Sequence, residues 1–314
     1  MKDFASLGYT KPLYILPFDH RNTFAETLFD KVSIADLNEE EIEQIREFKM
    51  LIYKGFKNAL KNSVPKEFAA ILCDEEFGAE ILVDSLHNGF VTLLPVEKSG
   101  SPEFQFQYED FGEHIEKFHP QFVKALVRFN PQDEENSKQR QKEKLQRLSD
   151  YCHEHNYKFI LEVLMNPTEI QLREAGTKYK FDLEIRPSLI VEVIEDFQSF
   201  GIEPDVWKLE GFERIEDYEK VVAVIKSSGR ENVNLVVLGR GGNEEQVDKW
   251  LEVGIKDEIF EVGQKVEGVI GFAVGRTVFW SAIEKFHNGE IGKAEAIKII
   301  SENFQNFYKL FTLG

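Results

Sequence analysis

Cysteine, positive charge and long apolar runs are scarce in this 314-residue chain. Its two cysteines, Cys73 and Cys152, form neither a disulfide framework nor a zinc motif, so a reducing cytoplasm is the expected compartment. The 38 basic residues against 56 acidic ones give a net charge of −18, which argues against nucleic-acid binding and against binding to anionic membranes. No run of about 18 apolar residues is present, so no membrane-spanning helix is expected. The N-terminus also lacks the apolar core of a signal peptide.

Eight short apolar runs alternate with longer amphipathic stretches. The runs cover residues 13–19, 68–74, 90–97, 122–130, 159–165, 206–211, 235–240 and 271–276. Such short and nearly continuous apolar runs are typical of buried parallel strands. The alternation predicts an α/β protein, a (β/α)8 TIM barrel that forms a single domain over residues 1–314. An open doubly wound sheet is the alternative, but no glycine-rich phosphate loop follows the first run.

Helical patterns fill the intervals at 39–61, 133–156, 187–200, 243–254 and 290–311. The first should begin at Asn38, with Glu41 in the position of a capping box. The last has an apolar face and is expected to pack on the barrel as an extra C-terminal helix. A dimerisation helix is the alternative, so a homo-oligomer stays open.

Charged residues in or after the strands are the candidates for an active site, because barrel enzymes place it at the C-terminal ends of the strands. Those singled out are Asp19, His20, Arg21, Asp74, Lys124, Arg128, Glu162 and Lys208. Lys124 and Arg128 lie four residues apart and therefore share one face of the fourth strand. Asp19 and Asp74 could each orient a lysine or a substrate hydroxyl, or could cap the turn that follows.

Lys208 is the most informative of these residues. It lies within the run VWKLEG, and lysine is seldom buried without a partner or a function. An enclosed amine near other cations is disfavoured in its charged form and can attack a carbonyl to form a Schiff base. The alternative is a structural salt bridge to Glu162 or Glu210.

Lys124 and Glu162 are candidate partners of that amine. Lys124 could hold a substrate oxygen or favour the neutral form of Lys208, or it could lie on the outer face under a helix. Glu162 interrupts the apolar run FILEVLM, where a carboxyl group can shuttle protons or serve as a lysine's counter-ion.

Two glycine–arginine turns fit a phosphate group. The first includes Gly239, Arg240 and Gly241, and the second includes Gly275 and Arg276. Glycine allows close approach of the backbone, a following helix offers free N–H groups, and arginine supplies a planar fork. Barrels often bind phosphate after strands seven and eight. The alternative is two ordinary turns with a surface arginine.

No cofactor or metal is expected. Of the seven histidines only His20 stands at a strand end, whereas a zinc-dependent aldolase needs several imidazole ligands.

A family resemblance emerges from six segments that occur in order along the chain: FDHR, CDEEFG, VKALVRF, ILEVLM, DVWKLEG and AVGRTVFW. They resemble the class I tagatose-1,6-bisphosphate aldolase group. The sequence is more closely similar to the aldolase-like domain (DUF2090) found at the C-terminus of some bacterial 5-dehydro-2-deoxygluconokinases of inositol catabolism.

The resemblance implies a (β/α)8 barrel and a metal-independent Schiff-base mechanism. It suggests Lys208 as the imine-forming lysine, Glu162 as acid and base, and Lys124 as the second lysine of the site. Asp19 matches the family's aspartate after the first strand, and Gly275 with Arg276 matches its phosphate contact.

The sequence departs from the tagatose enzymes at three places. His20 replaces a glutamine, the GRGG turn replaces a Ser/Gly-type turn, and the segment IRPSL around Arg186 resembles the kinase-linked domain instead. These differences bear on the sugar specificity more than on the lysine chemistry. His20, Arg21, Asp74, Arg128 and Arg186 are expected to bind the substrate or its phosphate.

The expected function is that of a class I aldolase acting on a small phosphorylated keto sugar or keto acid. Family analogy favours 5-dehydro-2-deoxygluconate 6-phosphate, which would give dihydroxyacetone phosphate and malonate semialdehyde. Tagatose 1,6-bisphosphate is the second candidate substrate. Two further functions are compatible with the same residues, a non-catalytic phosphosugar-binding barrel and a phosphosugar isomerase or epimerase.

Overall fold

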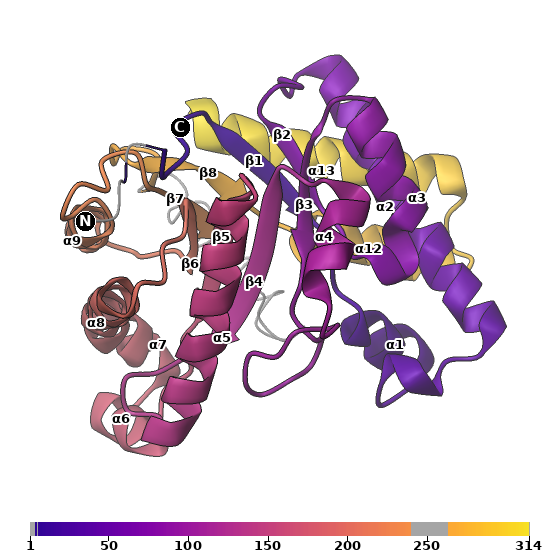
Figure 1. Ribbon diagram of the computed structural model, residues 1–314. Coiled ribbons are helices and arrows are strands. Elements are labelled where there is room, and N and C mark those ends of the chain that lie inside the picture. The colour runs from indigo at the N-terminus through magenta and orange to yellow at the C-terminus, as the bar shows by residue number, and fades with distance from the viewer. Residues whose placement is uncertain (1–3, 5, 240–262, 314) are drawn as a thin grey trace. The chain divides into compact units, whose positions relative to one another are not determined.

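A computed structural model describes residues 4, 6–239 and 263–313 of the chain (Figure 1). The expected helix at 243–254 and two candidate phosphate ligands, Arg240 and Gly241, lie outside these residues.

The strands follow one another in chain order, β1 to β8, around a closed barrel. Their bounds are β1 Leu13–Pro17, β2 Ala69–Leu72, β3 Val91–Pro95, β4 Phe122–Arg128, β5 Lys158–Leu164, β6 Val206–Glu210, β7 Asn234–Leu238 and β8 Val269–Ala273. Each strand begins within two residues of the start of an apolar run that predicted it. The predicted (β/α)8 barrel is therefore confirmed.

The described helices alternate with these strands. They are α1 Asn22–Phe29, η1 Ile34–Asp36, α2 Glu39–Asn62, α3 Glu75–His87, α4 Phe111–Phe118, α5 Glu135–Glu154, α6 Glu169–Ala175, α7 Lys178–Lys180, the π-helix η2 Phe181–Ile185, α8 Arg186–Phe200, α9 Ile215–Ile225, α12 Arg276–His287 and α13 Lys293–Leu313. Helix α2 begins at the predicted cap, where Asn38 and Glu41 form a reciprocal capping box. Among the described helices, none combines the length and apolar character needed to cross a membrane.

The chain forms two compact units. The first unit comprises Met1–Pro12, Val96–Gly112 and Phe122–Gly271, and the second comprises Leu13–Pro95, Glu113–Gln121 and Phe272–Gly314.

The first unit contains the parallel strands β4 to β7. In their register Leu126 pairs with Glu162, and Glu162 pairs with Lys208, so these side chains share one face. Trp207 points to the opposite face, where it is fully buried and stacks near Phe197 of α8. Alternation along β6 thus separates an aromatic face, which packs on a helix, from a charged face.

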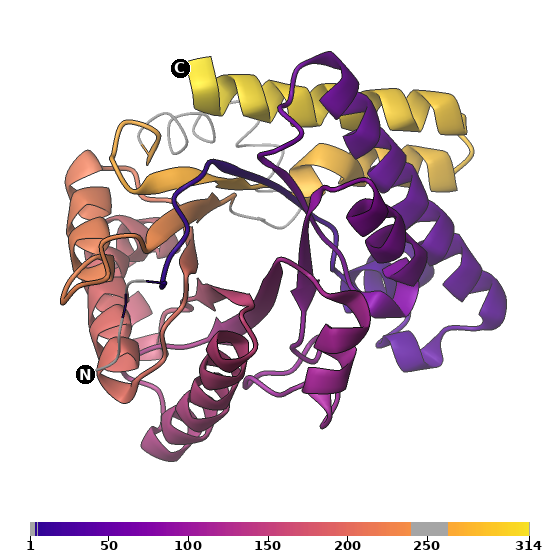
Figure 2. The ribbon, with the colours of Figure 1, turned by 45° about the horizontal axis from the view of Figure 1, so that its top comes forward.

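The second unit contains β1 to β3, and its helices α2, α12 and α13 pack side by side (Figures 1 and 2). Phe304 of α13 is fully buried and lies near Phe56 of α2 and Phe272 of β8. The C-terminal helix therefore packs within the fold, as expected.

Candidate active site

Lys208 lies in the middle of β6, and only 2% of its surface is exposed. Its Nζ atom donates a hydrogen bond to Glu162 Oε2 on the neighbouring strand β5, at 2.7 Å. Glu162 is 4% exposed. The pair forms because the parallel register places the two residues opposite each other on one face. The same contact is the salt bridge that a purely structural role for Lys208 would require.

Lys124 joins the same carboxylate from β4. Its Nζ lies 3.2 Å from Glu162 Oε2 and donates to the carboxylate of Glu97, which follows β3 in the chain. Both Lys124 and Glu97 are buried. The alternative position of Lys124, on the outer face under a helix, is not observed. We call Lys124, Lys208, Glu97 and Glu162 the charged cluster.

The charged cluster balances two ammonium groups against two carboxylates. Such a buried set is stable only when its charges are closely paired. Glu162 Oε2 lies within hydrogen-bonding distance of both amines, so a proton can pass between the carboxylate and either nitrogen without moving a strand. The arrangement therefore places an amine beside a carboxylate that can exchange a proton with it.

The remaining predicted residues of the first unit lie in different surroundings. Arg128 ends β4 with an exposed side chain, and its Nη1 is 3.4 Å from the carbonyl oxygen of Ser101. Arg186 is 1% exposed and donates to the carbonyl oxygens of Glu210 and Gly211. Gly239 follows β7 and is half-buried.

In the second unit, Asp19, His20 and Arg21 directly follow β1. Asp19 and His20 are half-buried, whereas Arg21 is 4% exposed at the start of α1. The loop is held by a residue that sequence reasoning missed: Lys49 of α2 donates to the carbonyl oxygens of Phe18, at 2.8 Å, and His20, at 3.0 Å.

Lys49 is fully buried and is ion-paired with Asp74. Asp74 also accepts a hydrogen bond from the N–H of Phe77 and so caps α3, one of its two expected roles. Lys49 could have been found in the sequence, because it lies three and four residues from Ile52 and Ile45 on the apolar stripe of α2.

The predicted phosphate turn after β8 has a clear geometry. A Cβ atom on Gly275 would lie 2.3 Å from the carbonyl oxygen of Pro17, so close packing against the end of β1 already requires glycine there. Arg276 begins α12 and is half-buried, and no described residue pairs with its guanidinium. Burial without a counter-ion among the described residues lowers the pKa of Arg276. Such an arginine is suited to an anion.

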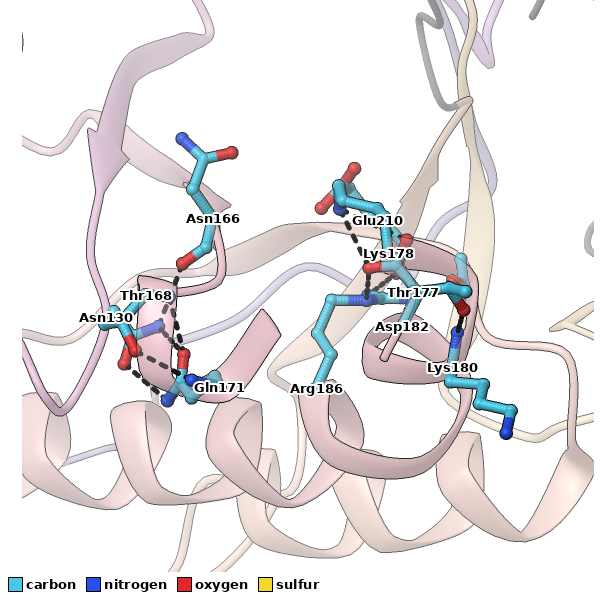
Figure 3. Close-up of polar contacts among 11 residues, drawn as sticks. Asn130, Asn166, Thr168, Gln171, Thr177, Lys178, Lys180, Asp182, Arg186 and Glu210 are labelled. Carbon is cyan, nitrogen blue, oxygen red and sulfur yellow. Dashed lines mark hydrogen bonds and ion pairs between the residues drawn. The ribbon is translucent and has the colours of Figure 1, made fainter. Parts of the chain in front are cut away.

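A buried amide network was also missed from the sequence. The Nδ2 group of Asn130, after β4, donates to the carbonyl oxygen of Asn166, at 2.9 Å, and to Gln171 Oε1 of α6, at 2.7 Å (Figure 3). The network anchors the segment between β5 and α8. Within the described residues, no three or more His, Cys, Asp or Glu side chains are grouped so that they could hold a metal ion.

These observations define a (β/α)8 barrel protein with an enclosed cluster of lysine and glutamate side chains. The chain belongs to the family described as "Uncharacterized protein conserved in bacteria (DUF2090)", whose match covers residues 7–313. No curated protein matches it.

Several solved structures share the fold. An archaeal fructose 1,6-bisphosphate aldolase is 13% identical, with a TM-score of 0.57 over 96% of this chain and 94% of that chain. A Schiff-base-forming fructose-1,6-bisphosphate aldolase is also 13% identical, with a TM-score of 0.55 and the same coverage. The YdjI aldolase from Escherichia coli K12 is 14% identical, with a TM-score of 0.50 over 83% of this chain and 87% of that chain. At these identities the likeness establishes the fold alone.

Proposed function

We propose that the protein is a class I aldolase, a carbon–carbon lyase that cleaves a phosphorylated keto sugar or keto acid through a lysine Schiff base. The observation that carries the proposal is the buried amine of Lys208, 2.7 Å from Glu162, with a second amine beside the same carboxylate. The fold shared with solved aldolases, one of them described as Schiff-base-forming, supports it.

The first step is formation of the imine. Glu162 accepts a proton from the ammonium group of Lys208, and the neutral amine attacks the substrate ketone to give a carbinolamine. Glu162 then returns the proton to the carbinolamine hydroxyl, which leaves as water. The product is a protonated imine on Lys208, with no net gain or loss of protons at Glu162.

The second step breaks the carbon–carbon bond. Glu162 removes the proton of the hydroxyl on the carbon β to the imine carbon, and the electron pair of the adjacent bond moves into the imine. An aldehyde leaves and an enamine remains. Protonation of the enamine carbon and addition of water then release the ketone product and restore Lys208. Lys124, held by Glu97, keeps Glu162 between the two amines and can bind a substrate oxygen.

We further propose 5-dehydro-2-deoxygluconate 6-phosphate as the substrate, with dihydroxyacetone phosphate and malonate semialdehyde as products. The resemblance to the kinase-linked aldolase domain supports this choice and a place in inositol catabolism. Tagatose 1,6-bisphosphate is the second candidate. Among the described residues, none forms an ion pair with the guanidinium of Arg276, and this group would bind the phosphate. Asp19 would orient a hydroxyl group of the substrate.

Borohydride trapping tests the mechanism directly. The protein is incubated with each candidate phosphate and sodium borohydride, digested, and mapped by mass spectrometry. We expect a reduced adduct on Lys208, and we expect Lys208→Met to abolish it while Lys124→Met retains it at a lower rate. Lys220, which is exposed on α9, provides a control for nonspecific labelling through Lys220→Met. An adduct on Lys124, or on neither lysine, would contradict the assignment.

A substitution at Glu162 tests the proton shuttle. Glu162→Gln keeps the shape of the side chain but cannot accept a proton, so we expect kcat to fall by about 10²–10⁴-fold. The rate of adduct formation should fall as well, because the same carboxylate deprotonates Lys208. A kcat within a factor of a few of the wild type would exclude Glu162 as the base.

A non-catalytic phosphosugar-binding barrel is the second candidate, because Lys208 is engaged in an ion pair. Calorimetry with the two phosphates distinguishes it. Binding without product formation or a trapped adduct would favour the binding protein over the aldolase.

A further inference from the structure

The guanidinium of Arg186 is enclosed at the C-terminal end of β6. The side chain is 1% exposed, and its Nη1 and Nη2 groups donate to the carbonyl oxygens of Glu210, at 3.1 Å, and Gly211, at 2.6 Å (Figure 3). The guanidinium also lies over the ring of Phe212, 4.8 Å from its centroid. Because arginine stays charged in proteins, these contacts offset the loss of its hydration.

A carboxylate in the preceding turn forms an ion pair with this guanidinium. Asp182 Oδ1 lies 3.2 Å from Arg186 Nε, and Asp182 is itself 6% exposed and paired with Lys178 at 3.1 Å. Asp182 belongs to the π-helical turn η2, which leads directly into α8. Short π-helical turns occur frequently at functional sites. We call Asp182, Arg186 and the two carbonyl groups the Arg186 clamp.

The Arg186 clamp acts on the strand that carries the reacting amine. Glu210 is the last residue of β6 and lies two residues after Lys208, so both occupy the same face of the strand. Fixing the carbonyl groups of residues 210 and 211 fixes the direction in which β6 ends. The Lys208–Glu162 distance of 2.7 Å depends on that direction, because the two residues are opposed only in the observed register.

We propose that Arg186, ion-paired with Asp182, is a positioning residue that holds the end of β6 and thereby places the Lys208 amine for reaction. The inference rests on the proposed aldolase function. It assigns to Arg186 a role through the backbone in place of the expected contact with substrate, because two of its donor groups are directed to backbone carbonyl groups and its charge is paired with Asp182.

The chain offers a matched control at the other end of the same strand. Arg230 is 7% exposed and donates through Nε and Nη2 to the two carboxylate oxygens of Glu203, each at 2.7 Å. Glu203 precedes β6 by three residues. Arg230→Met therefore removes an equally enclosed arginine pair near β6 without touching the strand's C-terminal end.

The kinetic experiment compares Arg186→Met, Arg186→Lys and Arg230→Met with the wild type on the phosphate that the wild type cleaves. Misplacing a reacting group by about 1 Å can cost about 10²-fold. We expect Arg186→Met to lower kcat and the rate of borohydride trapping on Lys208 by about 10–10²-fold, with KM little changed. Arg186→Lys should recover only part of the loss, because one ammonium group cannot reproduce the fork. Arg230→Met should retain kcat.

Hydrogen exchange provides a readout that needs no substrate. In Arg186→Met, amides of residues 209–212 should exchange faster than in the wild type, whereas Arg230→Met should leave them unchanged. Should Arg186→Met fail to fold, Arg186→Lys and Asp182→Asn carry the same comparison.

Two results would overturn the inference. A higher KM with unchanged kcat in Arg186→Met would make Arg186 a substrate ligand. An unchanged rate of amide exchange at residues 209–212 in a folded variant would show that Arg186 does not hold the end of β6. If the wild type itself forms no adduct with either candidate phosphate, the proposed function fails. The hydrogen-exchange comparison still decides whether Arg186 holds the end of β6.

Discussion

At the scale of single residues, two lysines on α2 show how burial changes the contribution of a lysine–aspartate ion pair to stability. Lys49 and Asp74 are fully enclosed, with side chains 0% and 2% exposed. Lys57 pairs with Asp84 of α3 at 2.9 Å, but these side chains are 33% and 47% exposed. The buried pair cannot exchange its partner for water, whereas the exposed pair can.

We expect Lys49→Met to lower the free energy of unfolding by about 3–5 kcal/mol, because it leaves the Asp74 carboxylate buried without its cation. Lys57→Met should cost only about 0–1 kcal/mol. Urea unfolding of both variants measures the difference. Equal losses of unfolding free energy in the two variants would show that burial does not determine how much the Lys49–Asp74 pair stabilises the fold.

The sequence predicted some of these buried charges and missed others for a physical reason. Lys124, Glu162 and Lys208 interrupt short apolar strands, where any charge stands out. Lys49 belongs to a long helix rich in lysine, so its burial depends on which helical face packs inward. Arg186 was recognised, but its hydrogen bonds go to backbone carbonyl groups at and just after the end of β6, and no sequence pattern encodes such a contact.

At the scale of secondary-structure elements, α2 and α13 approach each other closely at one glycine. A Cβ atom on Gly55 of α2 would lie 2.5 Å from Ile300 Cγ2 and 2.8 Å from Ile300 Cβ of α13. Ile300 is fully buried, so it has little room to move. By contrast, Gly292 precedes α13 and has open space around the position of a Cβ atom.

Gly55→Ala therefore sets two effects against each other. Alanine favours a helix by about 1 kcal/mol over glycine, whereas overpacking a core costs about 1–3 kcal/mol. We expect a net loss of stability, measured by thermal unfolding, while Gly292→Ala should leave the midpoint nearly unchanged. A higher midpoint for Gly55→Ala would mean that α13 moves aside freely.

Asp205 connects the N-terminal segment to the starts of β5 and β6. Its carboxylate accepts hydrogen bonds from the N–H groups of Gly8 and Phe159 and from Lys158 Nζ, each at 2.8 Å. Burial alone would raise the pKa of Asp205, but hydrogen bonds from His153 and Lys158 outweigh it and hold the pKa below its usual value. The ionised carboxylate therefore stabilises the folded state.

This stabilisation should be present above the unfolded-state pKa of about 3.9 and should be lost as the pH falls through the lower folded-state pKa. We expect Asp205→Asn to cost about 1–3 kcal/mol near pH 7, with the difference from wild type shrinking below about pH 4. Glu103→Gln, in an exposed pair with Arg140, is the control and should change little. A pH-independent loss in Asp205→Asn would assign the effect to packing.

The elements themselves were mostly predictable. Each apolar run became a strand, because buried parallel strands need no alternation and their apolar content is visible directly. Helical patterns predicted α2, α5, α8 and α13, whereas the sequence analysis gave no helical range for α1, α3, α4, α9 and α12. The short elements α6, α7 and η2 were not predicted either, because three to seven residues give too few repeats for a helical period to emerge.

At the scale of the whole molecule, the net charge of −18 opposes the compact state. Like charges repel more strongly in the folded chain than in the expanded unfolded one, and the repulsion extends over about 30 Å at 0.01 M salt but only about 10 Å at 0.1 M. Short buried pairs such as those in the charged cluster are screened much less than this long-range repulsion.

Raising NaCl from 0.01 M to 0.1 M at pH 7 should therefore raise the midpoint of thermal unfolding, where each gain of about 1 kcal/mol corresponds to roughly 2–4 °C for a domain of this order of size. The same salt step near the isoelectric point of about 4.9 provides the control. There the net repulsion vanishes and only attractive surface pairs remain to be screened, so the midpoint should stay level or fall. A midpoint that falls with salt at pH 7 would mean that surface ion pairs outweigh the excess of acidic residues.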